Sequence, residues 1–209
     1  RIKPFEPIVG TWEFRRQRGE REMVDTMTVS RDQAGQFSVN WEGGFGRRPN
    51  QGEGEGRPEI QTEISDVKYE GDKLTFTRKV TFGENERQST YAFTAEDNTI
   101  TGTMTSERGE REMEGQRVGG DLIGMWELTI TSDMGERNQL LWIQPDMTAW
   151  FGSTNVGKIT VEDGAITFDY EMGFGDQTFE NAFKGKVENG ILTGEMTNSQ
   201  GTQQVKGKK

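Results

Sequence analysis

The sequence predicts an all-β protein made of two tandem copies of one antiparallel meander unit, each folded as a barrel or as a two-sheet sandwich. Composition is the first reason. Glycine and threonine number 28 and 23, whereas the good helix formers alanine and leucine number six each. Apolar residues also alternate with polar ones, which is typical of strands that turn one face to a core. Finally, the pattern of the first half recurs in the second.

The repeat defines the domain organisation. Ile8–Phe14 (IVGTWEF) recurs as Leu122–Leu128 (LIGMWEL) at an offset of 114 residues, and Ile100–Thr105 recurs as Leu192–Thr197 at an offset of 92. The difference of 22 residues is additional sequence in the first copy, where the composition changes to glycine and arginine. We therefore expect an N-terminal extended arm over 1–7, a β-domain over 8–118 with an inserted loop at 43–58, and a second β-domain over 122–209.

Turn signals divide each copy into about eight strands. In the first copy, EGD at 70–72 and EDN at 96–98 mark turns, because Gly, Asp and Asn accept the backbone conformations of tight turns. Between turns, residues such as Leu74 and Phe76 share one apolar face. The strands of the first copy are expected at 8–16, 22–31, 36–42, 60–69, 73–82, 87–95, 99–106 and 111–118.

The interior of each unit has two interpretations. A barrel of about eight strands is just wide enough to be filled by side chains or to hold one small ligand. Large residues are expected to point inward in the second copy and to fill it. These are Trp126, Trp150, Phe168, Tyr170, Phe174, Phe183 and Met196.

Missing residue types exclude several functions. The chain has no Cys and no His, so disulfides, thiol nucleophiles, Cys/His zinc sites and imidazole catalysis are ruled out. A net charge of -10 argues against nucleic acid as a partner, and no apolar run is long enough for membrane insertion. No acidic pair stands out, so we expect neither an enzyme, nor a cofactor, nor a metal site.

Two short motifs carry a resemblance to known barrels. Gly10 and Trp12 lie on the first expected strand and Arg117 on the last, and Gly124, Trp126 and Lys209 repeat this arrangement. The Gly-x-Trp motif with a terminal basic residue resembles lipocalins and other calycin-type barrels. The resemblance implies that the basic side chain lies over the Trp ring and closes one end of the barrel, in a cation–π contact.

A second resemblance covers the later part of each copy. Ile64–Phe76 (ISDVKYEGDKLTF) and Ile100–Met104 (ITGTM) resemble an uncharacterised β-domain of exported planctomycete, verrucomicrobial and acidobacterial proteins. It implies a bacterial protein that is secreted or on the cell surface. The start at Arg1 fits a mature chain whose signal peptide has been removed.

One charged pair is out of place on the expected apolar faces. Arg78 lies between Phe76 and Val80, and Asp25 shares the inward parity of its own strand. Arg78 either binds a carboxylate ligand inside the barrel or forms a buried ion pair with Asp25, because an unpaired internal charge is costly. The second copy has Tyr170 and Gln139 at these positions, which favours the ion pair.

The two segments outside the repeat suggest self-assembly. The arm contains Ile2, Pro4, Phe5 and Pro7, and its prolines hold it extended. It docks either on its own domain or, by strand addition, on a neighbour, which would propagate head-to-tail into a fibre. The inserted loop offers further contacts through Phe45, Arg47, Arg48 and Arg57.

Two functions follow from the sequence. We expect first a non-enzymatic extracellular structural or interaction protein that self-assembles with itself as its partner, a fibre being one form of that assembly. The alternative is a calycin-like binding module for a small apolar or carboxylate ligand, with Arg78 as the anchor.

Overall fold

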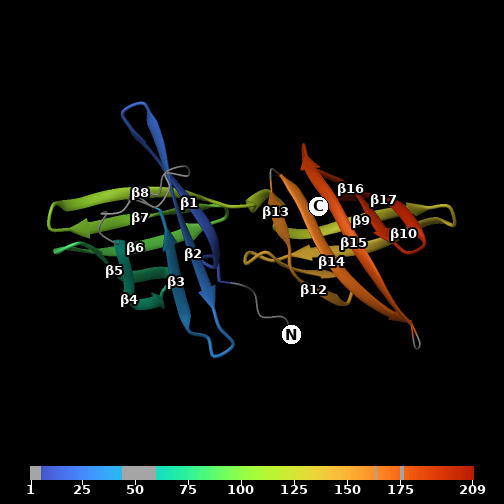
Figure 1. Cartoon of the computed structure of the whole chain (residues 1–209), viewed down its shortest axis with the longest axis horizontal. Helices are drawn as coiled ribbons and strands as arrows, with labels where there is room; N and C mark the ends of the chain where they lie inside the picture. The colour runs from blue at the N-terminus through green and yellow to red at the C-terminus, as the bar shows by residue number, and fades with distance from the viewer. Residues whose placement is uncertain (1–5, 44–59, 163, 175–176) are drawn as a thin grey trace. The chain divides into compact units, whose positions relative to one another are not determined.

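The computed structural model describes residues 6–43, 60–162, 164–174 and 177–209 (Figure 1). The chain divides into two compact units, Arg1–Val118 and Gly119–Lys209. Apart from a short 3-10 helix, η1 (Gly120–Leu122), the described elements are all strands, and every paired strand is antiparallel. The prediction of two all-β antiparallel units is therefore confirmed. No helix in these residues is long and apolar enough to cross a bilayer.

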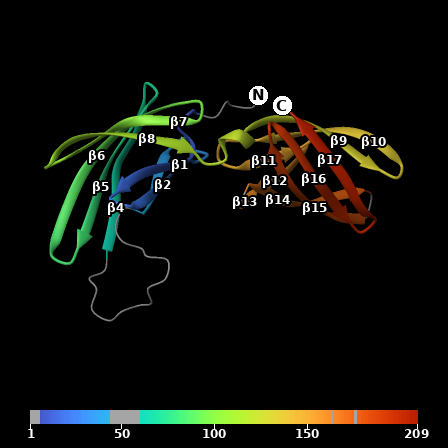
Figure 2. The same cartoon turned by 90° about the horizontal axis from the view of Figure 1, so that it is seen from above.

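The first unit is a single eight-stranded sheet in the order β3-β2-β1-β8-β7-β6-β5-β4. Neighbours in sequence are neighbours in the sheet, except that β3 and β4 are its two end strands and that β1 also pairs with β8, as in the pair Trp12–Arg117. The sheet curls until its end strands, β3 and β4, approach each other (Figure 1), which makes a nearly closed barrel rather than a sandwich; Figure 2 shows the same unit from above. Its strands are β1 (Gly10–Arg18), β2 (Arg21–Arg31), β3 (Phe37–Glu42), β4 (Ile60–Glu70), β5 (Lys73–Phe82), β6 (Asn85–Glu96), β7 (Thr99–Ser106) and β8 (Gly109–Arg117).

The second unit is a nine-stranded sheet in the order β12-β11-β10-β9-β17-β16-β15-β14-β13. It repeats the meander of the first, with β9 and β17 in the places of β1 and β8. Its strands are β9 (Gly124–Ser132), β10 (Gly135–Ile143), β11 (Thr148–Phe151), β12 (Thr154–Lys158), β13 (Thr160–Glu162), β14 (Ala165–Phe174), β15 (Gln177–Glu188), β16 (Ile191–Asn198) and β17 (Gly201–Lys208).

The second unit has nine strands, one more than the first, where about eight were expected in each copy. In the first unit β4 runs along β5 as one strand, with an irregularity at Asp66, whose φ is 56°. The matching stretch of the second unit is split. β12 forms a tight hairpin with β11 through Gly152, whose φ is 60°, and only β13 pairs with β14. Because the second copy lacks the insertion, its chain turns directly back onto β11.

An aromatic cluster forms the core of the first unit. The Trp41 ring lies 5.2 Å from the Phe14 ring and 5.1 Å from the Tyr91 ring, and Phe76 stacks on Tyr91 at 4.9 Å. Inward glycines make room for these rings. A Cβ at Gly102 would lie 2.6 Å from Phe93 Cδ1, closer than any side chain tolerates.

The Trp and basic residues of the Gly-x-Trp motif lie at one end of each barrel. In the first unit, the Arg117 guanidinium lies 4.0 Å from the Trp12 ring and donates to the carbonyls of Pro7, Val9 and Asp97. Burial lowers the pKa of Arg117 to about 10. We call this the closed end of the barrel.

The second unit has the same arrangement with fewer contacts. Lys209 Nζ lies 5.0 Å from the Trp126 ring and donates to the Asp121 carbonyl at 2.7 Å. Both indoles are fixed in the same way, since Trp12 and Trp126 donate to the carbonyl of the residue four positions earlier.

The expected inward position of Trp150 is wrong. This side chain is 37% exposed, while the next residue, Phe151, is buried in the core of the second unit. Trp150 pairs across strands with Trp142 on the outer face. The phase of β11 is thus one residue away from the expected phase, and in a strand such a shift moves every side chain to the other face.

Candidate functional site

A pocket of about 410 Å³ opens at the end of the first barrel opposite the closed end. It is formed where β1, β5 and β7 finish and where β2, β6 and β8 begin, with Trp41 from the end of β3. Strand alternation explains which side chains reach it. Trp12, Phe14 and Arg16 share the inner face of β1, so Arg16 is placed one layer beyond the aromatic core.

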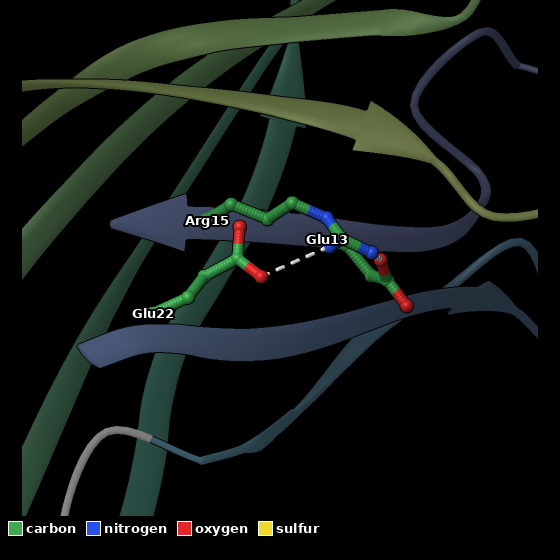
Figure 3. A network of polar contacts seen from close by, with 3 residues as sticks. All are labelled: Glu13, Arg15 and Glu22. Carbon is green, nitrogen blue, oxygen red and sulfur yellow. Dashed lines mark hydrogen bonds and ion pairs between the residues drawn. The ribbon is translucent and has the colours of Figure 1, made fainter. Parts of the chain in front are cut away.

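The neighbouring residue on β1 shows the opposite face. Arg15 is exposed and lies outside the barrel, where it pairs with Glu13 at 2.8 Å and with Glu22 at 3.4 Å (Figure 3). These are surface ion pairs of low energetic value. Arg15 and Arg16 are therefore chemically alike but serve different sides of the same strand.

Asp25 is the acidic group of the pocket. It is 2% exposed, and its Oδ2 accepts from Arg16 Nη2 at 2.6 Å. Burial raises the pKa of Asp25, although the nearby guanidinium groups of Arg16, Arg78 and Arg111 act in the opposite direction. The desolvation of the carboxylate thus outweighs three positive neighbours.

Arg78 does not form the ion pair with Asp25 that the sequence favoured, because Arg16 occupies that position. Arg78 is 7% exposed, and its guanidinium lies 5.3 Å from the Trp41 ring. Its hydrogen bond from Nη2 to the Gly43 carbonyl is long, at 3.4 Å. A buried guanidinium normally has several short partners, so Arg78 is poorly satisfied by the described residues.

Unpartnered polar atoms concentrate in this pocket. Four buried side-chain atoms have no hydrogen-bond partner in the described structure, and all four belong to residues that line it. Three are donors and one is an acceptor. They are Arg16 Nε, Trp41 Nε1, Arg78 Nε and Asp25 Oδ1. Buried polar groups are usually paired in folded proteins, so such a cluster requires an explanation.

The pocket is positively charged, in contrast to the chain as a whole. Its lining contains five arginines but only three acidic residues, whereas the whole chain has a net charge of -10. A local excess of guanidinium groups in an acidic protein favours an anion over a cation. The charged lining residues are Arg16, Arg78, Arg87, Arg108, Arg111, Asp25, Glu86 and Glu107.

The second barrel has lost these groups together. Arg16, Asp25, Trp41 and Arg78 correspond to Ile130, Gln139, Phe151 and Tyr170, by the repeat offsets and the strand pairing. Ile130, Phe151 and Tyr170 are buried in its core, and the Tyr170 hydroxyl donates to Met196 Sδ at 3.2 Å. The same framework is therefore filled with apolar and aromatic side chains in one unit and lined with charges in the other.

The outer faces of the two barrels also differ. Met125, Leu140 and Trp150 are exposed on the second barrel, with Trp142 among them, and together we call them the outer patch. The same positions of the first barrel hold polar residues, of which Thr11 and Thr28 are hydrogen-bonded at 3.2 Å. The corresponding residues of the first unit, in the same order, are Thr11, Thr26, Asn40 and Thr28.

The structure brings some predicted site residues together and leaves others untested. Arg78 and Asp25 both line the pocket, while Trp12, Arg117, Trp126 and Lys209 lie at the closed ends. Of the four predicted site residues of the arm, only Pro7 is described. The remaining arm and loop residues, Ile2, Pro4, Phe5, Phe45, Arg47, Arg48 and Arg57, lie outside the described residues.

Sequence reasoning missed Arg16, Trp41 and Arg111. The signal for Arg16 was present, because it continues the alternation of Trp12 and Phe14 on β1. Trp41 likewise falls in phase with Val39 on β3. Arg111 stands in a strongly charged stretch, where alternation gives no contrast between the two faces.

The fold comprises two tandem barrel-like antiparallel sheets, an arrangement compatible with calycin-like domains. No protein-family model matches the chain, and no curated protein is significantly similar to it in sequence. Among solved structures, it is similar to a protein of unknown function from the DUF3598 family of Nostoc punctiforme PCC 73102. The identity is 12%, the match covers 98% of this chain and 97% of that chain, and the TM-score is 0.22. The site is therefore interpreted from its own residues.

Proposed function

We propose that the first barrel is a binding module for a small organic carboxylate, held at the open end with Arg78 as its anchor. The observation that supports this most directly is the state of Arg78. It is a buried cation with a long hydrogen bond and an aromatic ring below it, at the base of an arginine-lined pocket. A carboxylate would supply the short, charge-assisted hydrogen bonds that the described residues do not.

The residues around Arg78 suit an anion that carries an apolar body. Trp41, Tyr91, Met104 and Met113 also line the pocket and offer aromatic and thioether surface. A volume of about 410 Å³ lies within the range of small-molecule sites, which is roughly 300–1,000 Å³. The ligand class is thus an aromatic or branched apolar acid rather than an inorganic anion.

The second barrel has a supporting role in this proposal. Its equivalent positions are occupied by Ile130, Phe151 and Tyr170, which fill the core. A duplicated framework with one filled copy and one charged copy is what we expect if only one copy binds a ligand.

Isothermal titration calorimetry of the full chain with phenylacetate and indole-3-acetate tests the proposal. Their primary amides, which keep the ring and lose the charge, serve as ligand controls. We expect the acids to bind and the amides to bind at least about tenfold more weakly, because a charge-assisted hydrogen bond is stronger than a neutral one. Equal affinity for acid and amide, or no binding of either acid, would contradict the proposal.

The chain supplies a matched protein control. Arg78→Gln removes the anchor from the pocket, whereas Arg15→Gln removes a guanidinium from the outer face of the same barrel. We expect Arg78→Gln to weaken phenylacetate binding by about tenfold or more, and Arg15→Gln to leave it unchanged. Equal effects of the two variants would mean that only the overall charge matters.

Self-assembly through the arm and the inserted loop stays a second proposal, as does export to the bacterial cell surface, which rests on the resemblance of Ile64–Phe76. One contact indicates that the last residue of the arm is held on the first barrel, since Arg117 donates a hydrogen bond to the Pro7 carbonyl. Deletion of residues 1–7 should then reduce any large species seen by light scattering. An unchanged size distribution would argue against a role for the arm.

A further inference from the structure

We propose that the ligand of the first barrel is a 2-hydroxy carboxylate, and that Asp25 selects it by accepting a hydrogen bond from its hydroxyl group. This inference rests on the proposed function. It adds a second recognition element to the carboxylate anchor, and so narrows the ligand class. Its basis is that the unpartnered atoms of the pocket are of two chemical kinds.

The first kind consists of donors. Arg16 Nε, Trp41 Nε1 and Arg78 Nε are N–H groups without an acceptor in the described residues. A ligand carboxylate satisfies such groups, because it is acceptor-only. If the pocket contained only these donors, any carboxylate of suitable size could bind to it.

The second kind is a single acceptor, Asp25 Oδ1. The other oxygen of this carboxylate is bound by Arg16 at 2.6 Å, while Oδ1 has no donor among the described residues. A ligand that offers only a carboxylate would leave Oδ1 unsatisfied and would bring two negative groups into one pocket. A ligand that also carries an O–H group pairs with Oδ1 and offsets this cost.

Gly43 shows that the acceptor and the anchor are close together. It accepts the hydrogen bond from Arg78 Nη2, and a Cβ at Gly43 would lie 2.9 Å from Asp25 Oδ1. Its φ of 103° also disfavours any other residue. Because Arg78 and Oδ1 both lie beside this one residue, a ligand that binds both needs its carboxylate and its hydroxyl close together, and a 2-hydroxy acid is the simplest such ligand.

The charge of the pocket decides between a hydroxyl and an amino group. An ammonium group would also donate to Asp25, but it would lie among the guanidinium groups of Arg16, Arg78 and Arg111, which all act on Asp25. Repulsion from three cations disfavours a positively charged donor. The donor is therefore neutral, which points to hydroxy acids and away from amino acids.

Three ligands with one ring and one carboxylate test the inference in the unmodified protein by calorimetry. Mandelate carries the 2-hydroxyl, phenylacetate lacks it, and 2-methoxy-2-phenylacetate replaces it with a methoxy group, which can accept a hydrogen bond but cannot donate one. We expect mandelate to bind at least about tenfold more tightly than the other two, because a buried acceptor left unpaired is penalised. Equal affinities for mandelate and phenylacetate would overturn the inference but not the proposed function. Absence of binding by all three would overturn both.

Two variants test whether Asp25 is the group that recognises the ligand hydroxyl. Asp25→Asn replaces the charged acceptor by a neutral amide and should reduce the preference for mandelate over phenylacetate to about threefold or less. Glu22→Gln, three residues away on the outer face of the same strand, should leave that preference unchanged. A preference that survives Asp25→Asn in full would show that another group recognises the hydroxyl. If Asp25→Asn fails to fold, the comparison of the three ligands on the unmodified protein still decides the question.

Discussion

Arg16 Nη2 lies 2.6 Å from Asp25 Oδ2, so an inward residue of β1 neutralises a buried carboxylate on the neighbouring strand β2. The two side chains differ in environment, because the Asp25 side chain is 4% exposed and the Arg16 side chain is 30% exposed. The pair stands at the boundary between the aromatic core and the open pocket. Its energetics therefore bear on both the stability of the first barrel and the chemistry of its pocket.

Replacing the pair by its counterpart from the second barrel should separate these roles. Arg16→Ile alone should destabilise the protein by about 1–3 kcal/mol, because it leaves the Asp25 charge buried without its nearest partner. Arg16→Ile combined with Asp25→Gln should recover most of that loss, since it copies Ile130 and Gln139. Urea unfolding of the single and double variants gives the coupling energy. Strictly additive effects would show that the pair is not coupled.

The raised pKa of Asp25 predicts a pH dependence of stability. Its folded-state pKa lies above the ordinary value of 3.8, so the folded state binds more protons than the unfolded state just above pH 3.8. The contribution of Asp25 to stability is thus fully present below that value and is lost as the pH rises through the raised pKa. The unfolding free energy of the natural protein, minus that of Asp25→Asn, should fall from pH 4 to pH 7 in urea titrations. A difference that grows over this range would mean that Arg16, Arg78 and Arg111 outweigh burial.

The inward glycines predict a packing defect. Gly102→Ala should destabilise the first barrel by about 1–3 kcal/mol, because the added methyl group would overlap the Ala92 carbonyl oxygen of the neighbouring strand and the Phe93 ring. Thr105→Ala, an exposed change on the same strand, should alter stability by no more than about 0.5 kcal/mol. Thermal unfolding of both variants measures the contrast. A Gly102→Ala protein as stable as the natural one would show that β6 and β7 can move apart at this point without cost.

The different numbers of contacts at the two closed ends predict different losses of stability when the basic residue is replaced. Arg117→Met removes hydrogen bonds to three carbonyls and the cation above Trp12, and should cost about 2–4 kcal/mol. Lys209→Met removes one hydrogen bond at an exposed site, and should cost about 1 kcal/mol or less. Denaturant unfolding monitored by tryptophan fluorescence compares them. Equal losses would indicate that the carbonyl contacts of Arg117 are unimportant.

Substitutions in the outer patch should change the hydrophobicity of the surface without changing the stability of the protein. Met125→Thr combined with Trp150→Asn installs the residues that the first barrel has at these positions. Since Met125 is 54% exposed, the double variant should elute earlier from a hydrophobic-interaction column while its melting temperature stays nearly the same. A large drop in melting temperature would show instead that these side chains hold the sheet together.

Most of the fold could be predicted from the sequence, because alternation and repetition both report on local geometry. The meander order and all eight strands of the first unit follow from the period-2 pattern and its turns. The split of β12 and β13 could not be predicted, because it depends on which neighbouring strand offers free backbone groups. The outward position of Trp150 was missed for a related reason, since β11 is only four residues long and its phase is weakly marked.

Less of the candidate site could be predicted. Arg78 and Asp25 stood out because charges are rare on an apolar face, but the identity of a partner is a question of three-dimensional distance. Parity placed Asp25 and Arg78 on inner faces, but it does not give the distance between two side chains, and the residue that pairs with Asp25, Arg16, was missed. The missing partners of Trp41 Nε1 and Asp25 Oδ1 are visible only once the whole surroundings of each atom are known.

The pairing of β1 with β8, and of β9 with β17, has a consequence for how such a chain is built. Because the first and last strands of a unit are hydrogen-bonded neighbours, its two ends emerge side by side, and its sheet is interrupted elsewhere, between β3 and β4. A unit of this kind can be followed by another through a very short joint, without crossing connections or opening the sheet. Each copy in a tandem duplication therefore keeps a complete sheet, and the interiors of the two copies can diverge independently, as the charged groups of the first barrel and the apolar groups of the second illustrate.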